Sequence, residues 1–443
     1  MHFLRTERKK LLIGLIVLFI LFNIGKFIKI RVATIDLPKG KIVFSSGLRG
    51  DNEVYLMNIN GTSLQRLTKY SFFGPTFNTW ITDFRSSFSP SGRMVIFDSD
   101  RDDKGLRMER TYYSGGIVGE HMLPTFREVY IIDVNGRDLV RLTHNRTRSY
   151  SPTFSPNGQR ILFYSTSFSN DPFYEELKII NSDGTNETIL AKGWGITRLA
   201  KFSPDSQKVF FVFRGDLHMV DIYKGTLTRL THFNIRDIDR PNKVEGLLFI
   251  DNFVLSPSGD KITLVTKEKN ALRFIFYSMN VDGSGMSQIN ILDNPDRRGY
   301  LGYIAEMKYS PDGKKITFIG HFKNRPFYIL DENNDLNFVR DLYGVDSKIE
   351  NIEDDLFVFT PDSKRILFVA SFTYDPFNDR FTWIKSIGYG ILGNLKYFIT
   401  RRISGSYDNK YLCVMDIKTG NVKKITRLPI SSELGRDFIH WEK

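Results

Sequence analysis

The chain has 443 residues, of which 41% are hydrophobic, 14% aromatic and 25% charged, and its formal net charge is +12. A charged fraction this ordinary, beside so many aromatic side chains, excludes a disordered or low-complexity chain. The single cysteine, Cys413, excludes a disulfide within the chain and a cysteine-based metal cluster. Half of the net charge, +6, lies in residues 1–40. The rest is only mildly basic, so we predict no nucleic-acid partner.

The N-terminus has the pattern of a membrane-inserted segment. Residues 11–25 form an uncharged apolar run that directly follows the basic residues 8–10. Such a flank is retained in the cytoplasm, and a cleaved signal peptide is the alternative. The predicted segments are a cytoplasmic basic flank at 1–10, a transmembrane signal anchor at 11–28 and a juxtamembrane stem at 29–40. We therefore expect a single-pass inner-membrane protein of the bacterial cell envelope, with its body on the periplasmic or extracytoplasmic side.

Past residue 40 the dominant signal is internal repetition. A five-residue motif built around Ser-Pro or Thr-Pro recurs six times, 48 to 66 residues apart. Its copies are FSPSG at 88–92, FSPNG at 154–158, FSPDS at 202–206, LSPSG at 255–259, YSPDG at 309–313 and FTPDS at 359–363. Each copy leads into an apolar run, and a second pair of runs follows around a turn that often contains Asn-Gly or Asp-Gly. This turn chemistry predicts units of four short antiparallel strands.

The two ends of the chain complete the count of units. Residues 41–68 supply the last three strands of a unit, and residues 437–441 (DFIHW) resemble a lone first strand. Such units stack radially, because one small sheet cannot bury both of its faces alone. We predict an all-β, seven-bladed β-propeller of four-stranded antiparallel blades over residues 41–443, closed by the C-terminal strand 437–441. A six-bladed ring is the alternative if residues 437–441 are only a tail.

These repeats resemble the TolB-like, or WD-like SPDG, β-propeller family of bacterial envelope proteins. The resemblance rests on F-S-P-D-G before an apolar strand, then E-x-Y-x-x-D-x-x-G and R-L-T, and covers essentially all of residues 41–443. It implies an extracytoplasmic binding scaffold, while the fold itself implies no single activity. Related propellers precede a hydrolase domain in prolyl-oligopeptidase-like peptidases, but no G-x-S-x-G motif occurs in this sequence.

Two groups of residues were weighed as metal ligands. His144 and His232 both follow R-L-T, which is a repeat position, so we interpret them as structural. Residues 98–109 have the D-x-D-x-D…E spacing of a calcium loop, but Asp103 stands where that loop needs glycine. We therefore predict neither a metal site nor a cofactor.

The long segments between strands all fall on one face of the predicted propeller. Loops this long in a compact repeat are usually functional. They are rich in aromatic residues and arginine, which are enriched at protein-recognition surfaces. The candidate partner-binding residues are Phe72, Phe73, Trp80, Tyr112, Tyr113, Phe377, Arg380, Trp383, Tyr389, Arg401 and Arg402. Residues 391–399 are an alternative contact with lipid headgroups.

The leading interpretation is a membrane-tethered, non-catalytic scaffold that binds a protein or envelope ligand through this long-loop face. With no catalytic motif found, we predict that the protein is not an enzyme. The alternative is a propeller enzyme, a lyase or hydrolase that acts on an envelope saccharide or peptide in the central channel. A structural spacer without a preferred partner is the third possibility.

Overall fold

The computed structural model describes residues 39–46, 52–69, 83–102, 106–113, 116–124, 126–145, 147–166, 174–197, 199–233, 248–268, 273–293, 302–320, 327–340, 349–372, 409–428 and 439–442. The chain divides into two units, Met1–Asp36 and Leu37–Lys443, and all described residues belong to the second. No helix in these ranges is long and apolar enough to cross a membrane. The predicted anchor at residues 11–28 lies outside them, so it stays a prediction.

Seven four-stranded antiparallel sheets make up the second unit, and we number them as blades 1 to 7. Blades 1 to 4 contain, in sheet order, β3 (Gln65–Arg66), β2 (Glu53–Asn58), β1 (Gly40–Ser46) and β30 (Ile439–Trp441); β4 (Asp83–Phe88), β5 (Met94–Ser99), β8 (Glu128–Asp133) and β9 (Val140–Arg141); β10 (Arg148–Phe154), β11 (Arg160–Thr166), β12 (Tyr174–Asn181) and β13 (Thr188–Trp194); and β14 (Lys201–Phe202), β15 (Lys208–Phe213), β16 (Asp216–Asp221) and β17 (Leu227–Arg229).

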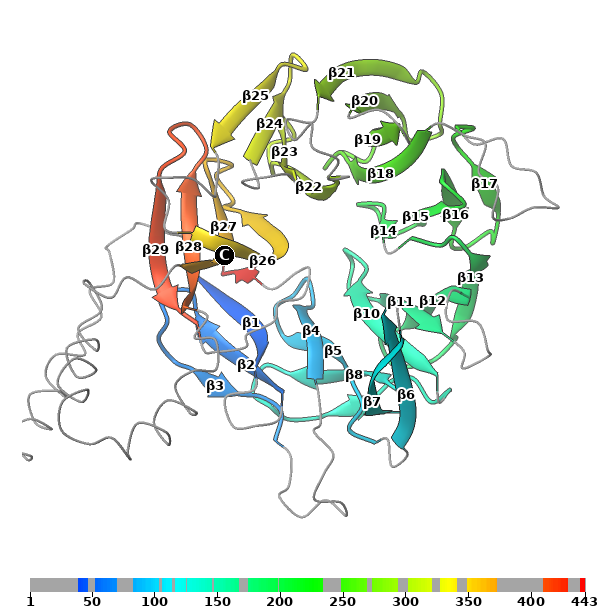
Figure 1. Cartoon of the computed structure of the whole chain (residues 1–443), viewed down its shortest axis with the longest axis vertical. Helices are drawn as coiled ribbons and strands as arrows, with labels where there is room; N and C mark the ends of the chain where they lie inside the picture. Colours follow the sequence, from blue (N-terminus) through cyan, green and yellow to red (C-terminus); the bar gives the residue numbers. More distant parts are fainter. Residues whose placement is uncertain are drawn as a thin grey trace, which may run out of the picture. The chain divides into compact units, whose positions relative to one another are not determined.

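Blades 5 to 7 follow the same plan, one strand after another along the chain. They contain β18 (Leu248–Leu255), β19 (Lys261–Glu268), β20 (Arg273–Asn280) and β21 (Ser287–Asp293); β22 (Ile304–Tyr309), β23 (Lys315–Gly320), β24 (Phe327–Asp331) and β25 (Leu336–Arg340); and β26 (Ile349–Phe359), β27 (Arg365–Phe372), β28 (Asn409–Asp416) and β29 (Val422–Arg427). The blades follow one another around a ring, with β10, β14 and β22 on its inner side and β13, β17 and β25 on its outer side (Figure 1). A separate two-stranded sheet, β6 (Leu106–Tyr113) and β7 (Gly116–Pro124), is inserted between β5 and β8 of blade 2.

The C-terminal strand closes the ring as predicted. It pairs antiparallel with β1, so that Lys41 lies opposite His440 and Ile42 opposite Ile439. The indole Nε1 of Trp441 also donates a hydrogen bond of 3.2 Å to the carbonyl of Phe359 in blade 7. The prediction of seven blades is therefore confirmed, and the six-bladed alternative is wrong.

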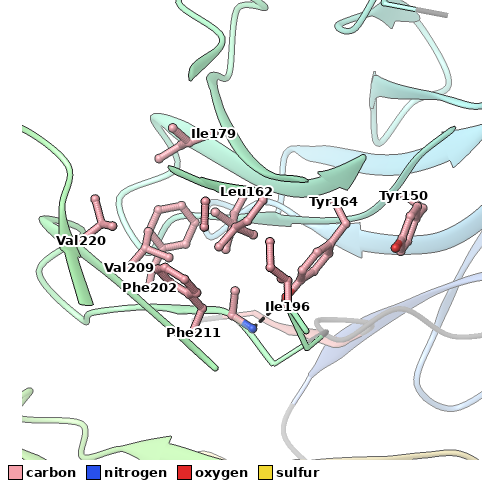
Figure 2. Packing of buried hydrophobic residues seen from close by; sticks show 12 residues of the cluster. Tyr150, Leu162, Tyr164, Ile179, Ile196, Phe202, Val209, Phe211 and Val220 are labelled. Carbon is pink, nitrogen blue, oxygen red and sulfur yellow. Dashed lines mark hydrogen bonds between the residues drawn. The ribbon is translucent and has the colours of Figure 1, made fainter. Parts of the chain in front are cut away.

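Apolar side chains on both faces of each blade hold neighbouring blades together. Alternate residues of a strand point to opposite faces, and in β11 Leu162 and Tyr164 pack toward blade 4 while Ile161 and Phe163 pack toward blade 2. Figure 2 shows the first of these contacts, where Tyr164 lies beside Ile196, and Leu162 belongs to the same cluster as Val209 and Phe211 of blade 4. Six such clusters join the successive pairs from blades 1 and 2 to blades 6 and 7. Each buried Phe or Leu contributes about 1.5–3 kcal/mol.

The Ser-Pro motif is a structural turn between the first two strands of a blade. Its Ser or Thr hydroxyl accepts a hydrogen bond of 2.9–3.1 Å from the backbone N–H five residues later. The residues that do so are Ser89, Ser155, Ser203, Ser256, Ser310 and Thr360. The last motif residue is left-handed, as at Gly259 (φ +76°), and this explains why glycine recurs there. Pro204 of blade 4 packs on Gly259 of blade 5, so the turns of successive blades interlock.

The R-L-T segments are structural as well. In blade 2 the Arg141 guanidinium pairs with Glu128 at 2.9 Å, and the Thr143 hydroxyl donates to the same carboxylate while it accepts a hydrogen bond of 2.9 Å from the N–H of Val129. Blade 4 repeats this arrangement with Asp216, Arg229 and Thr231. In blade 1 Arg66 pairs with Glu53, and the Thr68 hydroxyl accepts a hydrogen bond from the N–H of Val54. The repeated acid, arginine and threonine thus tie the outer strand to the third strand of the blade.

Candidate functional site

The innermost strands β4, β10, β18, β22 and β26 all have register shifts, and β4 and β10 also hold a left-handed residue within the shift. The pairing register shifts in β4 between Phe84 and Ser87, and in β10 between Tyr150 and Thr153. Within these two shifts Arg85 and Ser151 have φ values of +51° and +53°. Left-handed backbone costs a residue other than glycine about 1–3 kcal/mol, and such strain and such bulges occur preferentially at functional sites. Neighbouring blades 2 and 3 carry this strain at corresponding places.

A buried ion pair lies beside these two bulges. The Asp98 carboxylate, at the end of β5, is 0% exposed and accepts a hydrogen bond of 3.0 Å from Arg127 Nη1, just before β8. Its other oxygen accepts a hydrogen bond of 3.3 Å from the backbone N–H of Ser151 in blade 3. One carboxylate therefore joins two strands of blade 2 to the strained bulge of blade 3.

Aromatic rings hold the two arginines of this site. The Arg127 guanidinium lies 4.3 Å from the centroid of the Phe84 ring, and the Arg85 guanidinium lies 5.7 Å from that of Tyr150. Both distances are typical of cation–π contacts. We call Phe84, Arg85, Asp98, Arg127 and Tyr150 the Asp98 cluster.

The Asp98 cluster sets two guanidinium groups beside a buried carboxylate. Burial raises the pKa of the Asp98 carboxyl, against the lowering effect of the Arg127 and Arg85 guanidinium groups. Arg85 is half-buried and makes no ion pair with the part of the chain that the structure describes. The Tyr150 hydroxyl donates a hydrogen bond to the Glu175 carboxylate, so a second acidic side chain lies beside the cluster. The Arg85 guanidinium is the group suited to a carboxylate or carbonyl oxygen of a ligand.

Beyond this cluster, ion pairs also fix the start of the β6–β7 insertion. Arg101, five residues before the start of β6, pairs with Asp83 of β4 at 2.6 Å and lies 5.0 Å from the Phe97 ring centroid. Asp102 accepts a hydrogen bond of 2.7 Å from the Tyr130 hydroxyl. Burial and this carboxylate raise the pKa of Tyr130. The insertion therefore leaves blade 2 from a charged and well-packed root.

A second polar group lies between blades 5 and 6. Asp251, within the bulge of β18, accepts a hydrogen bond from the backbone N–H of Ile304 in β22. Burial raises the pKa of the Asp251 carboxyl to about 6. Nearby, the Lys267 ammonium donates to the carbonyl of Gly302. This group joins two innermost strands. Among the described residues, Lys267 is the one charged side chain that acts on the Asp251 carboxyl, so the group has fewer cations to bind a ligand than the Asp98 cluster.

Most of the candidate residues named from the sequence lie outside the described residues: Phe72, Phe73, Trp80, Phe377, Arg380, Trp383, Tyr389, Arg401 and Arg402. Tyr112 and Tyr113 lie in β6, where they pair with Ile117 and Gly116 of β7. The proposed long-loop binding surface therefore stays a prediction.

The structure assigns other partners to the residues of the calcium-loop spacing. Asp98 pairs with Arg127, and Asp102 pairs with Tyr130 and Arg141. His144 and His232 are exposed and follow the R-L-T segments. Within the described ranges, no three His, Cys, Asp or Glu side chains are placed to hold a metal.

Sequence reasoning missed the Asp98 cluster. Asp98 was noticed only as part of an acidic run, and nothing near Arg85 or Arg127 distinguishes them from other basic residues. One signal was present in the strand Asp83–Phe88, which reads DFRSSF. Arg85, a charged residue, lies in the middle of this largely buried strand. A polar residue in an inner strand is a better pointer than a loop aromatic.

No family model matches the chain. A Sulfurisphaera tokodaii protein named as a tricorn-like protease C-terminal subunit is 26% identical over 239 residues, which are 53% of this chain and 25% of that protein. Dipeptidyl-peptidase 5 of Porphyromonas gingivalis is 27% identical over 292 residues, which are 55% of this chain and 40% of the peptidase. The chain thus matches less than half the length of either relative.

Solved structures with a similar fold include TolB-like β-propellers. TolB from Acinetobacter baumannii is 14% identical with a TM-score of 0.39, over 68% of this chain and 63% of that one. An oligogalacturonate lyase in complex with manganese is 13% identical with a TM-score of 0.49, over 89% of this chain and 87% of that one. Likenesses this remote concern the fold alone.

The curated relatives overturn two predictions. The protein was predicted to be a non-catalytic scaffold and not to be an enzyme, whereas both relatives are named as peptidases. The scaffold prediction rested on the export segment, the repeat and the long segments on one face, and the prediction of no enzyme rested on the absence of a catalytic motif. A propeller is compatible with many activities, and G-x-S-x-G identifies only one kind of nucleophile.

Proposed function

We propose that the protein is an enzyme of peptide hydrolysis whose propeller binds the peptide at the Asp98 cluster. The observation that carries the proposal is that two proteins named as peptidases each match more than half of this chain, 53% and 55% of it. The Asp98 cluster supports it, because it combines two guanidinium groups, aromatic rings and backbone strain on the inner side of the ring. No described residue favours the saccharide alternative in the same way.

The roles of the cluster residues follow from their burial. Asp98 is fully buried, so it acts on the ligand only through the groups that it holds. It fixes Arg127 over Phe84 and the N–H of Ser151, and so keeps both bulges in place. Arg85 is the cation left for the ligand, and its guanidinium suits the carbonyl or carboxylate oxygens of a peptide.

The test uses the purified full chain and a library of fluorescence-quenched peptides, with mass spectrometry to locate the cleaved bond. We expect hydrolysis, and we expect Arg85→Ala to raise KM about tenfold with a smaller change in kcat. Arg160→Ala is the matched control, because Arg160 also lies over a tyrosine ring, 5.1 Å from the centroid of Tyr223, but is remote from the cluster in the sheet of blade 3. A folded protein that cleaves no member of the library overturns the proposal.

We also propose the finer assignments made from the sequence. The recurring SP turn and R-L-T segment support membership of the TolB-like SPDG-repeat family. The basic flank and apolar run support a transmembrane anchor at 11–28 and an extracytoplasmic propeller. Protease protection of membrane vesicles tests both the anchor and the side on which the propeller lies.

A further inference from the structure

The β6–β7 hairpin is a sheet of its own. Its pairing runs from Leu106 opposite Pro124 to Tyr113 opposite Gly116, with one register shift between Thr111 and Tyr112. At about 3.3 Å per residue, a strand of this length extends over roughly 25 Å. The hairpin is thus longer than the turns that join the other strands of blade 2.

The hairpin has two open edges within the described residues. Neither β6 nor β7 pairs there with a third strand. A strand at an edge presents a row of backbone N–H and C=O groups, which an extended chain can satisfy by adding a further strand. In this mode of recognition the hydrogen bonds go to the main chain of the ligand, so many different side chains are tolerated.

The root of the hairpin is fixed next to the proposed substrate site. On the β5 side Arg101 is 10% exposed and pairs with Asp83 of the innermost strand. On the β8 side Arg127 is 15% exposed and pairs with Asp98. Arg127 therefore belongs both to the root of the hairpin and to the Asp98 cluster.

We infer that an extended peptide substrate pairs with an edge of the β6–β7 hairpin and forms a third strand. This inference rests on the proposed function, which supplies a peptide as the occupant. The open backbone edge supplies its binding mode, and Arg127 links the root of the hairpin to the Asp98 cluster. Binding is expected to depend on the backbone of the peptide more than on its side chains.

The experiment uses the full chain and a fluorescein-labelled eight-residue peptide of alternating valine and threonine, with a lysine added at each end. Fluorescence anisotropy measures its affinity, and hydrogen exchange with mass spectrometry maps protection. The control peptide has the same side chains but is N-methylated at its four central residues, so both of its edges lose donors. We expect at least tenfold weaker binding of the control peptide, and slower exchange in residues 106–124 only with the unmethylated one.

A variant with residues 106–124 replaced by a short Gly-Ser linker completes the test, with its unfolding compared with that of the wild type. Equal binding of both peptides, or protection elsewhere in the chain, overturns the inference. Protection of 106–124 that depends on protein concentration without peptide would assign the edge to a second copy and also overturn it. Peptide pairing without hydrolysis rejects only the proposed function, whereas hydrolysis unaffected by loss of the hairpin rejects only this inference.

Discussion

Replacement of Asp98 by alanine tests the reasoning about the cluster most directly. The carboxylate is fully buried, accepts a hydrogen bond of 3.0 Å from Arg127 and one of 3.3 Å from the N–H of Ser151. A hydrogen bond to a charged group contributes about 1.5–3 kcal/mol and a neutral one about 0.5–1.5 kcal/mol. Arg127 is left without this partner while still 85% covered, which adds to the loss. We expect Asp98→Ala to lower the free energy of unfolding at pH 7 by about 3 kcal/mol.

The graded variants separate charge from hydrogen bonding. Asp98→Asn keeps one acceptor oxygen, which serves only one of the two donors, and its NH2 group faces the other, so at least about half of the loss is expected. In a double-mutant cycle, Asp98→Ala and Arg127→Ala together should cost at least about 1 kcal/mol less than the sum of the single changes. Urea unfolding followed by tryptophan fluorescence measures the stability of the wild type, the three single variants and the double variant. If Asp98→Ala costs less than about 0.5 kcal/mol, or the two changes are additive, the pair is not the buried link between blades 2 and 3 described above.

Three further predictions concern other parts of the ring. The folded pKa of Asp251, about 6, exceeds its ordinary value of 3.8, so the contribution of Asp251 to stability falls by about 2.4 kcal/mol as pH rises from 4 to 7. In urea titrations, Asp251→Asn should therefore gain about 2.4 kcal/mol of stability relative to wild type over the same range. Gly92→Ala places a Cβ 2.2 Å from His440 Nε2 at a φ of +67°, so the melting temperature should fall. His440→Ala in the same chain removes the clash but not the backbone strain, so it should restore the melting temperature only in part. Restoration to the full wild-type value would contradict the backbone strain. Thr143→Val removes both hydrogen bonds of the Thr143 hydroxyl and leaves Glu128 with one donor fewer, so the free energy of unfolding should fall by about 2 kcal/mol. The same change at the exposed Thr188 is the control.

Much of the fold could be predicted because its information is local. A hydrogen bond from a Ser hydroxyl to a backbone N–H five residues away, as at Ser203 and Lys208, requires only neighbouring residues, and it repeats in every motif. The closing strand could be predicted too. Residues 41–68 lack the first strand of a unit, and residues 437–441 resemble a first strand that no second strand follows, so the two segments together complete one blade. The structure places that strand at Ile439–Trp441, within the predicted range.

The candidate site could not be predicted in this way. Asp98 of β5, Arg127 just before β8 and Ser151 of β10 are brought together from two blades, and their spacing in the chain carries no period. The left-handed Arg85 depends on a register shift in β4, which no local pattern announces. The predicted loop aromatics attracted attention because composition is visible in a sequence, whereas burial and pairing are not.

The sequence by itself determined the repeat, the number of blades and the way in which the ring closes, because turn chemistry and alternating apolar residues act within each unit. Only the tertiary structure decided which polar residues face one another across blades, because that depends on the packing of sheets whose residues are distant in the chain. The acidic run at Asp98 shows the difference: its spacing suggested calcium, and its position between Arg127 and Ser151 made it the link between two strained strands.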